Sequence, residues 1–594
     1  MKLQQTLPAD MTRLSRPGMA EGTLGLSLSS GLPMSFKTYL LFVSLFLCGA
    51  GLRAMNVTRP IDQPEWRECD EASIARNFYD EGMNILYPRV DWRGSGPGYA
   101  EMEFPLQPWL MALLYQVFGY KEVFGRVIVL VTSLLTMFIF FRLALYLLPS
   151  GGALAAVTFF AFHPMLIRMA TAVQPEGIMI LFYVLAVFAF VRWLQQELWR
   201  DYWVALVATA LAILAKAPAA NLGLFFAILM YHRSGFSGFL DPKAWLFGLG
   251  ALLPGVLWYT HARSLWLTYG NSLGLSNEYH WVGLDLFTNP QFLRGILRQE
   301  IAHVWTLPGA IVGFACIIAA WRERLLRVEL AWLAAIGVFY LVSARTTRKE
   351  WSYYYHIFSV IPAALLLGTG VASLRKWQWQ PRHLTALFLL IVCGTTLFGV
   401  MGYLGTSLPS ERVVHWAAGL GVPALLLGGL GLLGKLGSHD GPPPRHSLGN
   451  SLFACILMCG LGASYFSEIV AIHWHASPWG RDPLYQAAAH FQGRLSEPGL
   501  IVASGASCQD RDGYALAYNN SYMFYWLHRK GFNMPLQRQS LSTLRELSNQ
   551  GARYFVAEKL YVVSLPGFYD ELRSNLTLIA ETDVACLYRL PTGQ

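Results

Sequence analysis

An acidic pair, Asp70 and Glu71, lies in a polar loop that follows the first apolar segment of the chain. The surrounding sequence DEASIARNFYDEG has the spacing of a short helix, which we expect to lie along a membrane surface. A carboxylate held there can take a proton from an attacking hydroxyl or amine, as a general base does. Because the loop also holds Asp62, Glu65 and Glu68, a solvated acidic loop is the simpler alternative.

Two further acids are candidates to shape a cavity or contact an acceptor. Glu103 lies just ahead of a proline-containing turn that starts an apolar helix, and Glu176 directly follows a proline at the start of another apolar segment. A glutamate at a helix start also complements the helix dipole, so capping alone would explain either residue. Their expected position on the same face as Asp70 favours a shared polar cavity.

Three basic residues are followed by three consecutive tyrosines and a histidine in the segment SARTTRKEWSYYYHIF. Guanidinium groups bind phosphate in a bidentate manner, and a lipid phosphate needs such donors at the membrane interface. An aromatic belt would explain some of the tyrosines, and a snorkelling side chain would explain an isolated lysine. The candidates for binding a carrier phosphate are Arg345, Arg348, Lys349, Tyr355, His356, Lys216 and Arg263.

The composition places these residues in a membrane protein. Of the 594 residues, 54% are hydrophobic and 14% charged, whereas soluble domains carry about 25% charged residues. The net charge of +9 suits a protein that contacts anionic lipid or phosphate. No basic stretch is long enough, or sufficiently interleaved with aromatics, to indicate a nucleic-acid partner.

The apolar segments predict an all-α polytopic membrane protein with about thirteen transmembrane helices. A hydrocarbon core requires about 20 residues per helix, so the ends of each segment are approximate. The expected spans are 38–54, 126–148, 152–168, 177–195, 202–218, 220–232, 245–262, 301–320, 329–343, 355–373, 384–404, 412–434 and 450–473.

Alternation through the membrane brings the candidate residues to one side. With residues 1–36 as a cytoplasmic tail, the first loop, residues 55–108, and the other candidate loops all face outward. Short connectors such as RWLQQELWRD and WRERLLRVE then face inward, and their basic character agrees with the positive-inside rule. We therefore expect a transmembrane domain over residues 37–473 with a catalytic first outer loop.

Residues 474–594 predict a small extracytoplasmic α/β domain. GLIVASG, ARYFVAEK and DVACLYRL have the character of strands, and SYMFYWLHRKGF and LSTLRELSNQG that of helices. The domain has no glycine-rich phosphate loop, which favours a structural or acceptor-guiding role. An oxidising compartment would allow a disulfide between Cys508 and Cys586.

An ordered set of motifs resembles a known family. DE in the first loop, EFPLQPW, QPE, LAKAP, WYTHARSL and YYYHIFSVIPAALLLG occur in the order found in GT-C membrane glycosyltransferases of the protein O-mannosyltransferase and aminoarabinose transferase type, a glycosyltransferase family 39-like group. The resemblance covers about residues 36–475, and the tail is similar to the extracytoplasmic domain of bacterial members.

The resemblance implies an inverting glycosyltransferase of a bacterial-type cytoplasmic membrane. Such an enzyme moves a hexosyl or pentosyl group from a polyprenyl-phosphate carrier to a glycan, lipid or protein acceptor on the outer face. Asp70 matches the family's first-loop aspartate, the catalytic base or acceptor-orienting group, and Glu71 completes the pair. Glu176 matches a second acidic position, and Tyr355 or His356 falls where members place a tyrosine near the carrier phosphate.

Two positions depart from the aminoarabinose transferases. Those enzymes carry an arginine three residues after the aspartate, where this chain has Ser73, and a lysine before the proline-containing turn, where it has Glu103 or Phe104. A generic bacterial member is the closer match, with carrier phosphate bound by other cations. No protein cofactor is implied, although a divalent cation held between Asp70 and Glu176 is a further hypothesis.

Two other functions use the same residues without catalysis. A transporter or flippase of a lipid-linked sugar would bind the phosphate through the same cations, but it should show an internal repeat or paired interrupted spans. The sequence shows no convincing repeat. A non-catalytic assembly subunit would tolerate replacement of the acids.

Overall fold

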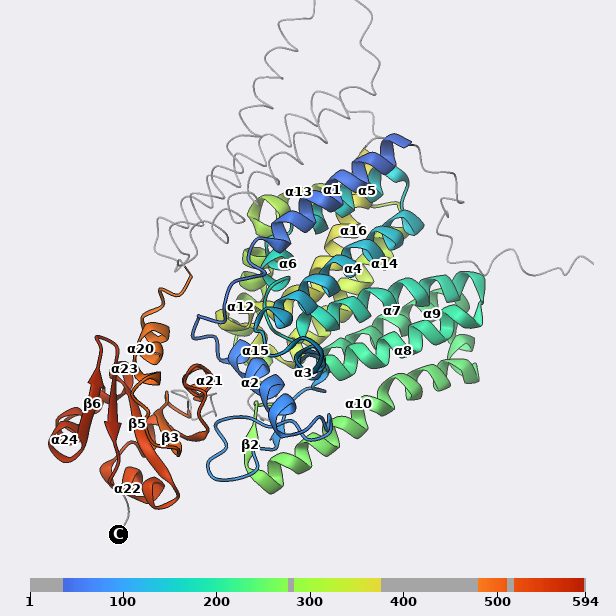
Figure 1. Cartoon of the computed structure of the whole chain (residues 1–594). Helices are drawn as coiled ribbons and strands as arrows, with labels where there is room; N and C mark the ends of the chain where they lie inside the picture. Colours follow the sequence, from blue (N-terminus) through green and yellow to red (C-terminus); the bar gives the residue numbers. More distant parts are fainter. Residues whose placement is uncertain (1–35, 276–281, 375–478, 510–517, 592–594) are drawn as a thin grey trace, which may run out of the picture.

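The structure, a computed structural model, describes residues 36–275, 282–374, 479–509 and 518–591. It comprises a body of packed helices and a smaller mixed sheet flanked by helices (Figure 1). The first part of the helical body consists of α1 (Phe36–Ala54), α2 (Trp66–Glu81), α3 (Leu106–Phe118), α4 (Val123–Leu147), α5 (Ser150–Ala161), α6 (Pro164–Met169), α7 (Glu176–Gln196), α8 (Trp199–Ala215), η1 (Ala217–Ala220), α9 (Asn221–Ser234), η2 (Gly235–Leu240) and α10 (Pro242–Tyr269).

The second part of the body contains shorter helices before two long ones. Two short strands, β1 (Ala100–Glu101) and β2 (Asn271–Ser272), pair in parallel and tie the first loop to the end of α10. The remaining helices of the body are α11 (Asp285–Thr288), α12 (Gln291–Gln299), η4 (Glu300–Trp305), α13 (Thr306–Ala319), α14 (Arg324–Val342), α15 (Ala344–Thr347), η5 (Glu350–His356) and α16 (Ile357–Leu374).

Among the described residues, four helical stretches are long and apolar enough to cross a membrane. They are α4, α7, α14 and the continuous stretch Glu350–Ser373, and a pair bent by 89°, Gln291–Trp305 with Gly309–Ala319, would be a fifth. The described helices therefore agree with a multi-pass membrane protein. The expected spans 384–404, 412–434 and 450–473 lie outside the described residues, so the number thirteen stays a prediction.

Close packing joins the helices that frame the site. Buried apolar side chains of α4, α5, α7, α8, α9, α14 and α16 form one continuous core. Small residues let membrane helices approach closely, and a Cβ added to Gly152 of α5 would lie 2.7 Å from the Gly368 carbonyl oxygen of α16. This contact holds α16, and with it the tyrosine-rich η5, against the rest of the body.

The C-terminal sheet has the strand order β4-β3-β5-β7-β6. β4, β3 and β5 are parallel, whereas β7 is antiparallel to both β5 and β6. Parallel neighbours need crossover connections, which here contain α21 and α22. The elements are α20 (Pro483–Gln492), β3 (Leu500–Ser504), α21 (Ser521–Leu527), β4 (Gly531–Met534), η6 (Leu536–Arg538), α22 (Leu541–Asn549), β5 (Ala552–Glu558), α23 (Lys559–Val562), α24 (Phe568–Asn575), β6 (Thr577–Glu581) and β7 (Ala585–Arg589).

The suggested disulfide in this domain is not formed. Cys508 and Cys586 are both free. The Cys508 thiol contacts Gln537 Oε1 at 3.3 Å, whereas Cys586 Sγ lies 3.7 Å from the Tyr569 hydroxyl. Each sulfur thus has a polar neighbour of its own, and the two residues take part in different contacts.

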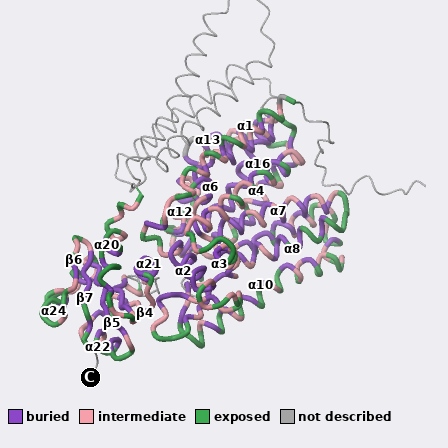
Figure 2. The backbone as a smooth tube through the Cα atoms, in the orientation of Figure 1, coloured by how far each residue is buried: buried purple, intermediate pink, exposed green. Residues whose placement is uncertain are grey.

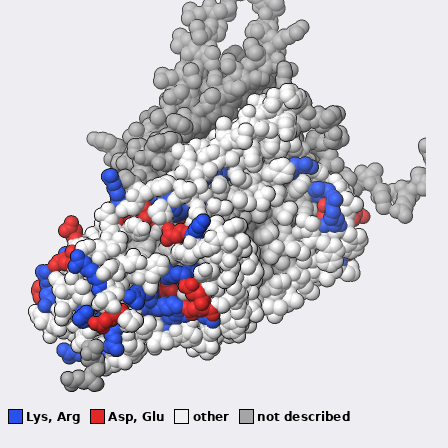
Figure 3. Space-filling model, in the orientation of Figure 1, with Lys and Arg blue, Asp and Glu red and all other residues white. Residues whose placement is uncertain are grey.

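The C-terminal domain packs directly on the first loop, with α21 against α2 (Figure 1). The Trp526 indole donates to the Ile61 carbonyl over 2.7 Å, and the Ser521 hydroxyl donates to the Trp66 carbonyl over 2.7 Å. Apolar side chains of both segments share a second core. Figure 2 shows the resulting burial of α2. On the face shown in Figure 3, many charged side chains gather near this junction, and a second group lies at the far end of the otherwise uncharged helical body. The position of α2 therefore depends on the C-terminal domain.

Candidate active site

The helix α2 buries the acidic pair. Asp70 is fully buried and Glu71 is 1% exposed. The helix ends at Gly82, which adopts a positive φ of 120° and whose amide donates to the Phe78 carbonyl. The expectation of a short helix over this segment agrees with the structure. Because both side chains are buried, the alternative of a solvated acidic loop does not hold for this pair. Buried carboxylates usually have a partner or a functional role.

Asp70 is held by one side chain of the same loop. The Trp92 indole nitrogen donates to Asp70 Oδ1 over 2.8 Å, and no donor among the described residues reaches Oδ2. Burial raises the pKa of Asp70 to about 7, and the Trp92 hydrogen bond and the Arg67 charge limit that rise. A carboxylate with a pKa near neutrality and one unoccupied oxygen has the properties of a general base.

Arg67 lies one turn before Asp70 and contacts two acids that are far apart within the first loop. Its guanidinium forms an ion pair with Glu103, and its Nε lies 3.8 Å from Glu71 Oε1. Burial raises the pKa of Glu71 to about 8. Burial also tends to raise the pKa of Glu103, but the charges of Arg67 and Lys216 outweigh it and leave that pKa below its ordinary value.

Lys216 and Glu176 form a second buried ion pair beside the first. Lys216 follows the last residue of α8, and Glu176 is the first residue of α7. The Lys216 ammonium lies 4.7 Å and 4.8 Å from the ring centres of Tyr354 and Tyr355, within the range of cation–π attraction. We call Arg67, Glu71, Glu103, Glu176 and Lys216 the charged cluster.

An apolar groove opens next to the charged cluster, between α8 and α10. Its volume is about 410 Å³, and its lining includes Ala217, which follows Lys216, and Tyr259, whose hydroxyl donates to the Ile213 carbonyl over 2.9 Å. Exposed Arg263 borders the same groove. A groove of apolar side chains bordered by an arginine suits a molecule with an anionic head and a hydrocarbon chain.

The remaining candidate cations make other contacts. Arg345 donates to Asp285 over 2.9 Å, and the Arg348 guanidinium lies 4.6 Å from the ring centre of Phe292. His356 Nδ1 lies 2.6 Å from Glu300 Oε1, and its Nε2 lies 2.9 Å from a backbone carbonyl. Lys349 is half-buried.

The structure thus brings together six of the candidate residues: Asp70, Glu71, Glu103, Glu176, Lys216 and Tyr355. Arg345, Arg348 and His356 instead contact α11, α12, η4 and α15.

Two residues of the site were not identified from the sequence. Arg67 precedes Asp70 by three positions and Glu71 by four, a spacing that places all three on neighbouring turns of one helix. That spacing could have indicated the ion pair. Trp92 lies 22 positions after Asp70, and no sequence pattern predicts this contact, because it depends on how the loop folds back over α2.

The described residues contain no group of three or more histidine, cysteine, aspartate or glutamate side chains arranged to hold a metal ion. The acids of the charged cluster face Arg67 and Lys216, so cationic side chains already lie beside them. A divalent cation between Asp70 and Glu176 stays a prediction.

Comparison with known proteins identifies the fold. The family model of dolichyl-phosphate-mannose-protein mannosyltransferases matches residues 102–259, a segment that includes Glu103, Glu176 and Lys216. No curated protein sequence matches the chain. The crystal structure of ArnT from Cupriavidus metallidurans in the apo state is similar, with 17% identity, a TM-score of 0.57 and coverage of 93% of this chain and 97% of ArnT.

The same ArnT has also been crystallised bound to undecaprenyl phosphate. That structure matches with 16% identity and a TM-score of 0.56, over 94% of this chain and 98% of ArnT. At this identity the likeness establishes the fold. The chain therefore has the fold of these ArnT structures, and the match over residues 102–259 agrees with the resemblance that its motifs indicated.

Proposed function

We propose that the protein is an inverting glycosyltransferase that moves a sugar from a polyprenyl-phosphate carrier to an acceptor on the outer face of the cytoplasmic membrane. The observation that carries this proposal is the placement of a buried carboxylate with an unoccupied oxygen, Asp70, one helical turn from a buried guanidinium, Arg67. A base and a phosphate-binding cation are the two groups that such a transfer requires.

The reaction follows from that arrangement. Asp70 Oδ2 takes the proton of the acceptor hydroxyl, and the acceptor oxygen attacks the anomeric carbon of the donor sugar. The bond between that carbon and the phosphate oxygen breaks on the opposite side, which inverts the configuration. Polyprenyl phosphate leaves with the bonding electrons, and the proton remains on Asp70. The Trp92 hydrogen bond fixes the carboxylate for this transfer.

Arg67 and Lys216 bind the carrier phosphate in this proposal. Arg67 Nη1 is buried, and no acceptor in the described part of the chain reaches it, so a phosphate oxygen would complete its hydrogen bonding. The resemblance places the lysine of the aminoarabinose transferases at Glu103 or Phe104 of this chain, and Glu103 is the ion-pair partner of Arg67. Arg67 thus supplies a positive charge beside the position where the lysine is missing.

The prenyl chain lies in the groove between α8 and α10. Its lining includes Ala217, the residue after Lys216, and Arg263. A similar structure, ArnT bound to undecaprenyl phosphate, supports a carrier of this class. Positive charge at the departing phosphate stabilises the negative charge that builds on it in the transition state.

The substitution Asp70→Asn tests the proposal, with Asp80→Asn as the matched control. Asp80 is an exposed acid near the end of the same helix. Mass spectrometry of envelope lipids and glycans should show loss of the product and accumulation of the lipid-linked donor in Asp70→Asn, and no change in Asp80→Asn. Unchanged product in Asp70→Asn at normal protein level would reject catalysis by this residue. It would favour a transporter, which needs no base.

A further inference from the structure

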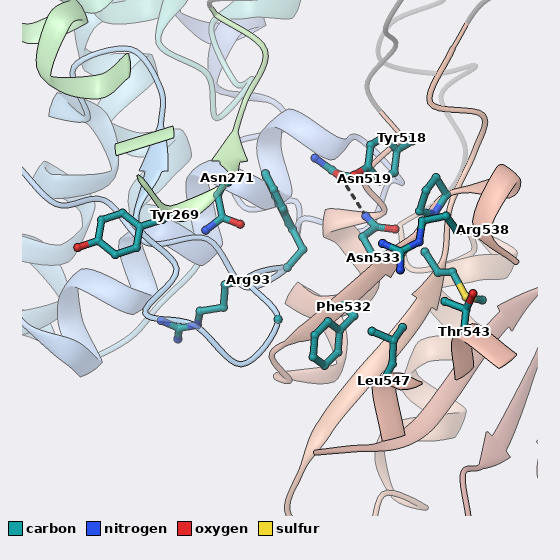
Figure 4. Close-up of a pocket in the computed structure, with 15 residues that line it drawn as sticks. Arg93, Tyr269, Asn271, Tyr518, Asn519, Phe532, Asn533, Arg538, Thr543 and Leu547 are labelled. Atoms are coloured by element: carbon teal, nitrogen blue, oxygen red, sulfur yellow. Dashed lines mark hydrogen bonds between the residues drawn. The ribbon is translucent and has the colours of Figure 1, made fainter. Parts of the chain in front are cut away.

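A second pocket, which we call the junction pocket, lies where the first loop meets the C-terminal domain (Figure 4). Its volume is about 420 Å³. Trp92 and Arg93 come from the first loop, Asn271 comes from β2, and Asn533 and Arg538 come from the C-terminal domain. The pocket is therefore formed by three segments that are far apart in the sequence.

Backbone hydrogen bonds join the two main walls of the junction pocket. The Gly94 amide donates to the Gly531 carbonyl over 2.6 Å, and the Gly531 amide donates to the Asp91 carbonyl over 3.0 Å. The first loop thereby pairs with the start of β4. Phe532 lies beside Gly94, where an added Cβ would come within 2.9 Å of the ring. The walls are thus fixed to each other by specific contacts.

The side chains of the junction pocket suit a carbohydrate. Aromatic rings of Trp92, Tyr269 and Tyr518 can cover the apolar face of a sugar ring. The amides of Asn519 and Asn533 can both donate to and accept from hydroxyl groups. Asn533 Nδ2 lies 3.4 Å from Asn519 Oδ1, and no donor among the described residues reaches Asn533 Oδ1. The described lining thus combines aromatic rings with amide groups.

The charged residues in the described lining of the junction pocket are all basic. Its described lining contains Arg93 and Arg538 and no aspartate or glutamate. Arg93 is already paired with Glu81. Arg538 contacts Glu546 at 3.6 Å, and the side chains of Arg538 and Glu546 are each more than half exposed. Such an exposed pair is weak, so Arg538 can bind a carboxylate or phosphate of a ligand in preference.

Trp92 connects the junction pocket to the base. Its side chain lines the pocket, and its indole nitrogen donates to Asp70 Oδ1. Trp92 therefore belongs both to the pocket wall and to the hydrogen bonding of Asp70. The lining of the α8–α10 groove includes Ala217, the residue next to Lys216 of the charged cluster. A polar pocket and an apolar groove therefore lie near the charged groups of the site, and different residues line each of them.

We propose that the junction pocket is the acceptor subsite and that it takes a saccharide bearing an acidic group, with Arg538 binding that group and Trp92 bordering the reacting hydroxyl. This inference rests on the proposed function, because it assigns the acceptor of that same reaction. The C-terminal domain then supplies half of the acceptor site in addition to holding α2 in place.

Binding of defined oligosaccharides to the purified full-length chain tests this inference without any transfer reaction. The probes are tri-galacturonic acid, the neutral trisaccharide maltotriose and an acidic peptide of similar charge, each measured by saturation-transfer NMR in lipid nanodiscs. We expect tri-galacturonic acid to bind. Arg538→Ala should weaken that binding about tenfold, the loss of one charge-assisted contact. Arg545→Ala, which removes a nearby exposed arginine that does not line the pocket, should leave binding unchanged.

The outcomes separate this inference from the proposed function. Absence of oligosaccharide binding, equal binding of maltotriose, an unchanged affinity in Arg538→Ala, or binding of the peptide alone would each overturn the acceptor assignment. Asp70→Asn should bind tri-galacturonic acid normally while it fails to transfer sugar. If Asp70→Asn transfers sugar normally, the proposed function fails, and the binding result still decides whether this pocket takes an acidic saccharide.

Discussion

The Trp92 indole donates a hydrogen bond of 2.8 Å to Asp70 Oδ1 and also forms part of the junction pocket wall. This single side chain therefore contacts the proposed base on one side and the proposed acceptor subsite on the other. The hydrogen bond favours the ionised carboxylate, whereas burial favours the neutral acid. The balance between these two effects leaves the pKa of Asp70 at about 7.

A pH profile should report this balance. Only ionised Asp70 can accept a proton, so kcat/KM should rise with pH by about tenfold per unit below pH 7 and level off above it. Trp92→Phe removes the hydrogen bond that favours the carboxylate, and the pKa of Asp70 should then rise. The rising part of the kcat/KM profile should therefore move to higher pH. At high pH, the transfer rate of Trp92→Phe should approach that of the wild type. If the rising part of the profile does not shift in Trp92→Phe, a group other than Asp70 controls the pH dependence of kcat/KM.

Donor affinity should separate two possible phosphate sites. Arg67→Ala removes a buried guanidinium beside Glu71 and Glu103. We expect a loss of at least about tenfold in kcat/KM for the lipid donor, since charge-assisted contacts to phosphate are strong. Arg345→Ala, whose side chain binds Asp285, should stay within about twofold of wild type. If Arg345→Ala lowers kcat/KM more than Arg67→Ala does, the phosphate binds near the tyrosine-rich segment instead.

The Lys216–Glu176 pair allows structure and function to be separated. Lys216→Met leaves Glu176 buried without its partner, which should cost about 3–5 kcal/mol of stability. The double variant Lys216→Met with Glu176→Gln contains no unpaired charge, and its thermal stability should largely recover. Transfer should stay low in both variants, because the phosphate has lost one cation. Recovery of transfer together with stability would make this pair purely structural.

Membrane orientation can be measured at exposed positions. In a chain whose native cysteines are replaced, Asp80→Cys marks the end of α2, and Arg200→Cys marks the start of α8, next to the connector from α7. A membrane-impermeant maleimide should label Asp80→Cys in intact cells, whereas Arg200→Cys should react only after permeabilisation. Labelling of Arg200→Cys alone in intact cells would reverse the orientation and place the site in the cytoplasm.

Local sequence patterns predicted the elements of the fold better than their contacts. The strands expected in GLIVASG, ARYFVAEK and DVACLYRL correspond to β3, β5 and β7, because alternating or continuous apolar runs are local features. The helix that carries Asp70 was predictable for the same reason. How the first loop pairs with β4 was not predictable, because that contact joins Gly94 to Gly531 across more than 400 positions.

The site illustrates the same limit. Glu103, Glu176 and Lys216 were recognised from motifs, but the sequence could not show which cations meet which acids. Lys216 reaches Glu176 because α7 and α8 pack side by side. Arg345, in a segment equally rich in basic residues, instead binds Asp285. Choosing between these cations requires the packing of distant helices, which residue types alone do not specify.

The most direct measurement uses the lipid that accumulates in the Asp70→Asn strain as the substrate. Extracted lipid is added to proteoliposomes that contain wild type, Asp70→Asn or Asp80→Asn, together with an acceptor extract from the same strain. Wild type and Asp80→Asn should convert the lipid to free polyprenyl phosphate and glycosylated acceptor, whereas Asp70→Asn should be slower by about 100-fold or more. Conversion by Asp70→Asn at the wild-type rate would contradict the assignment of Asp70 as the base.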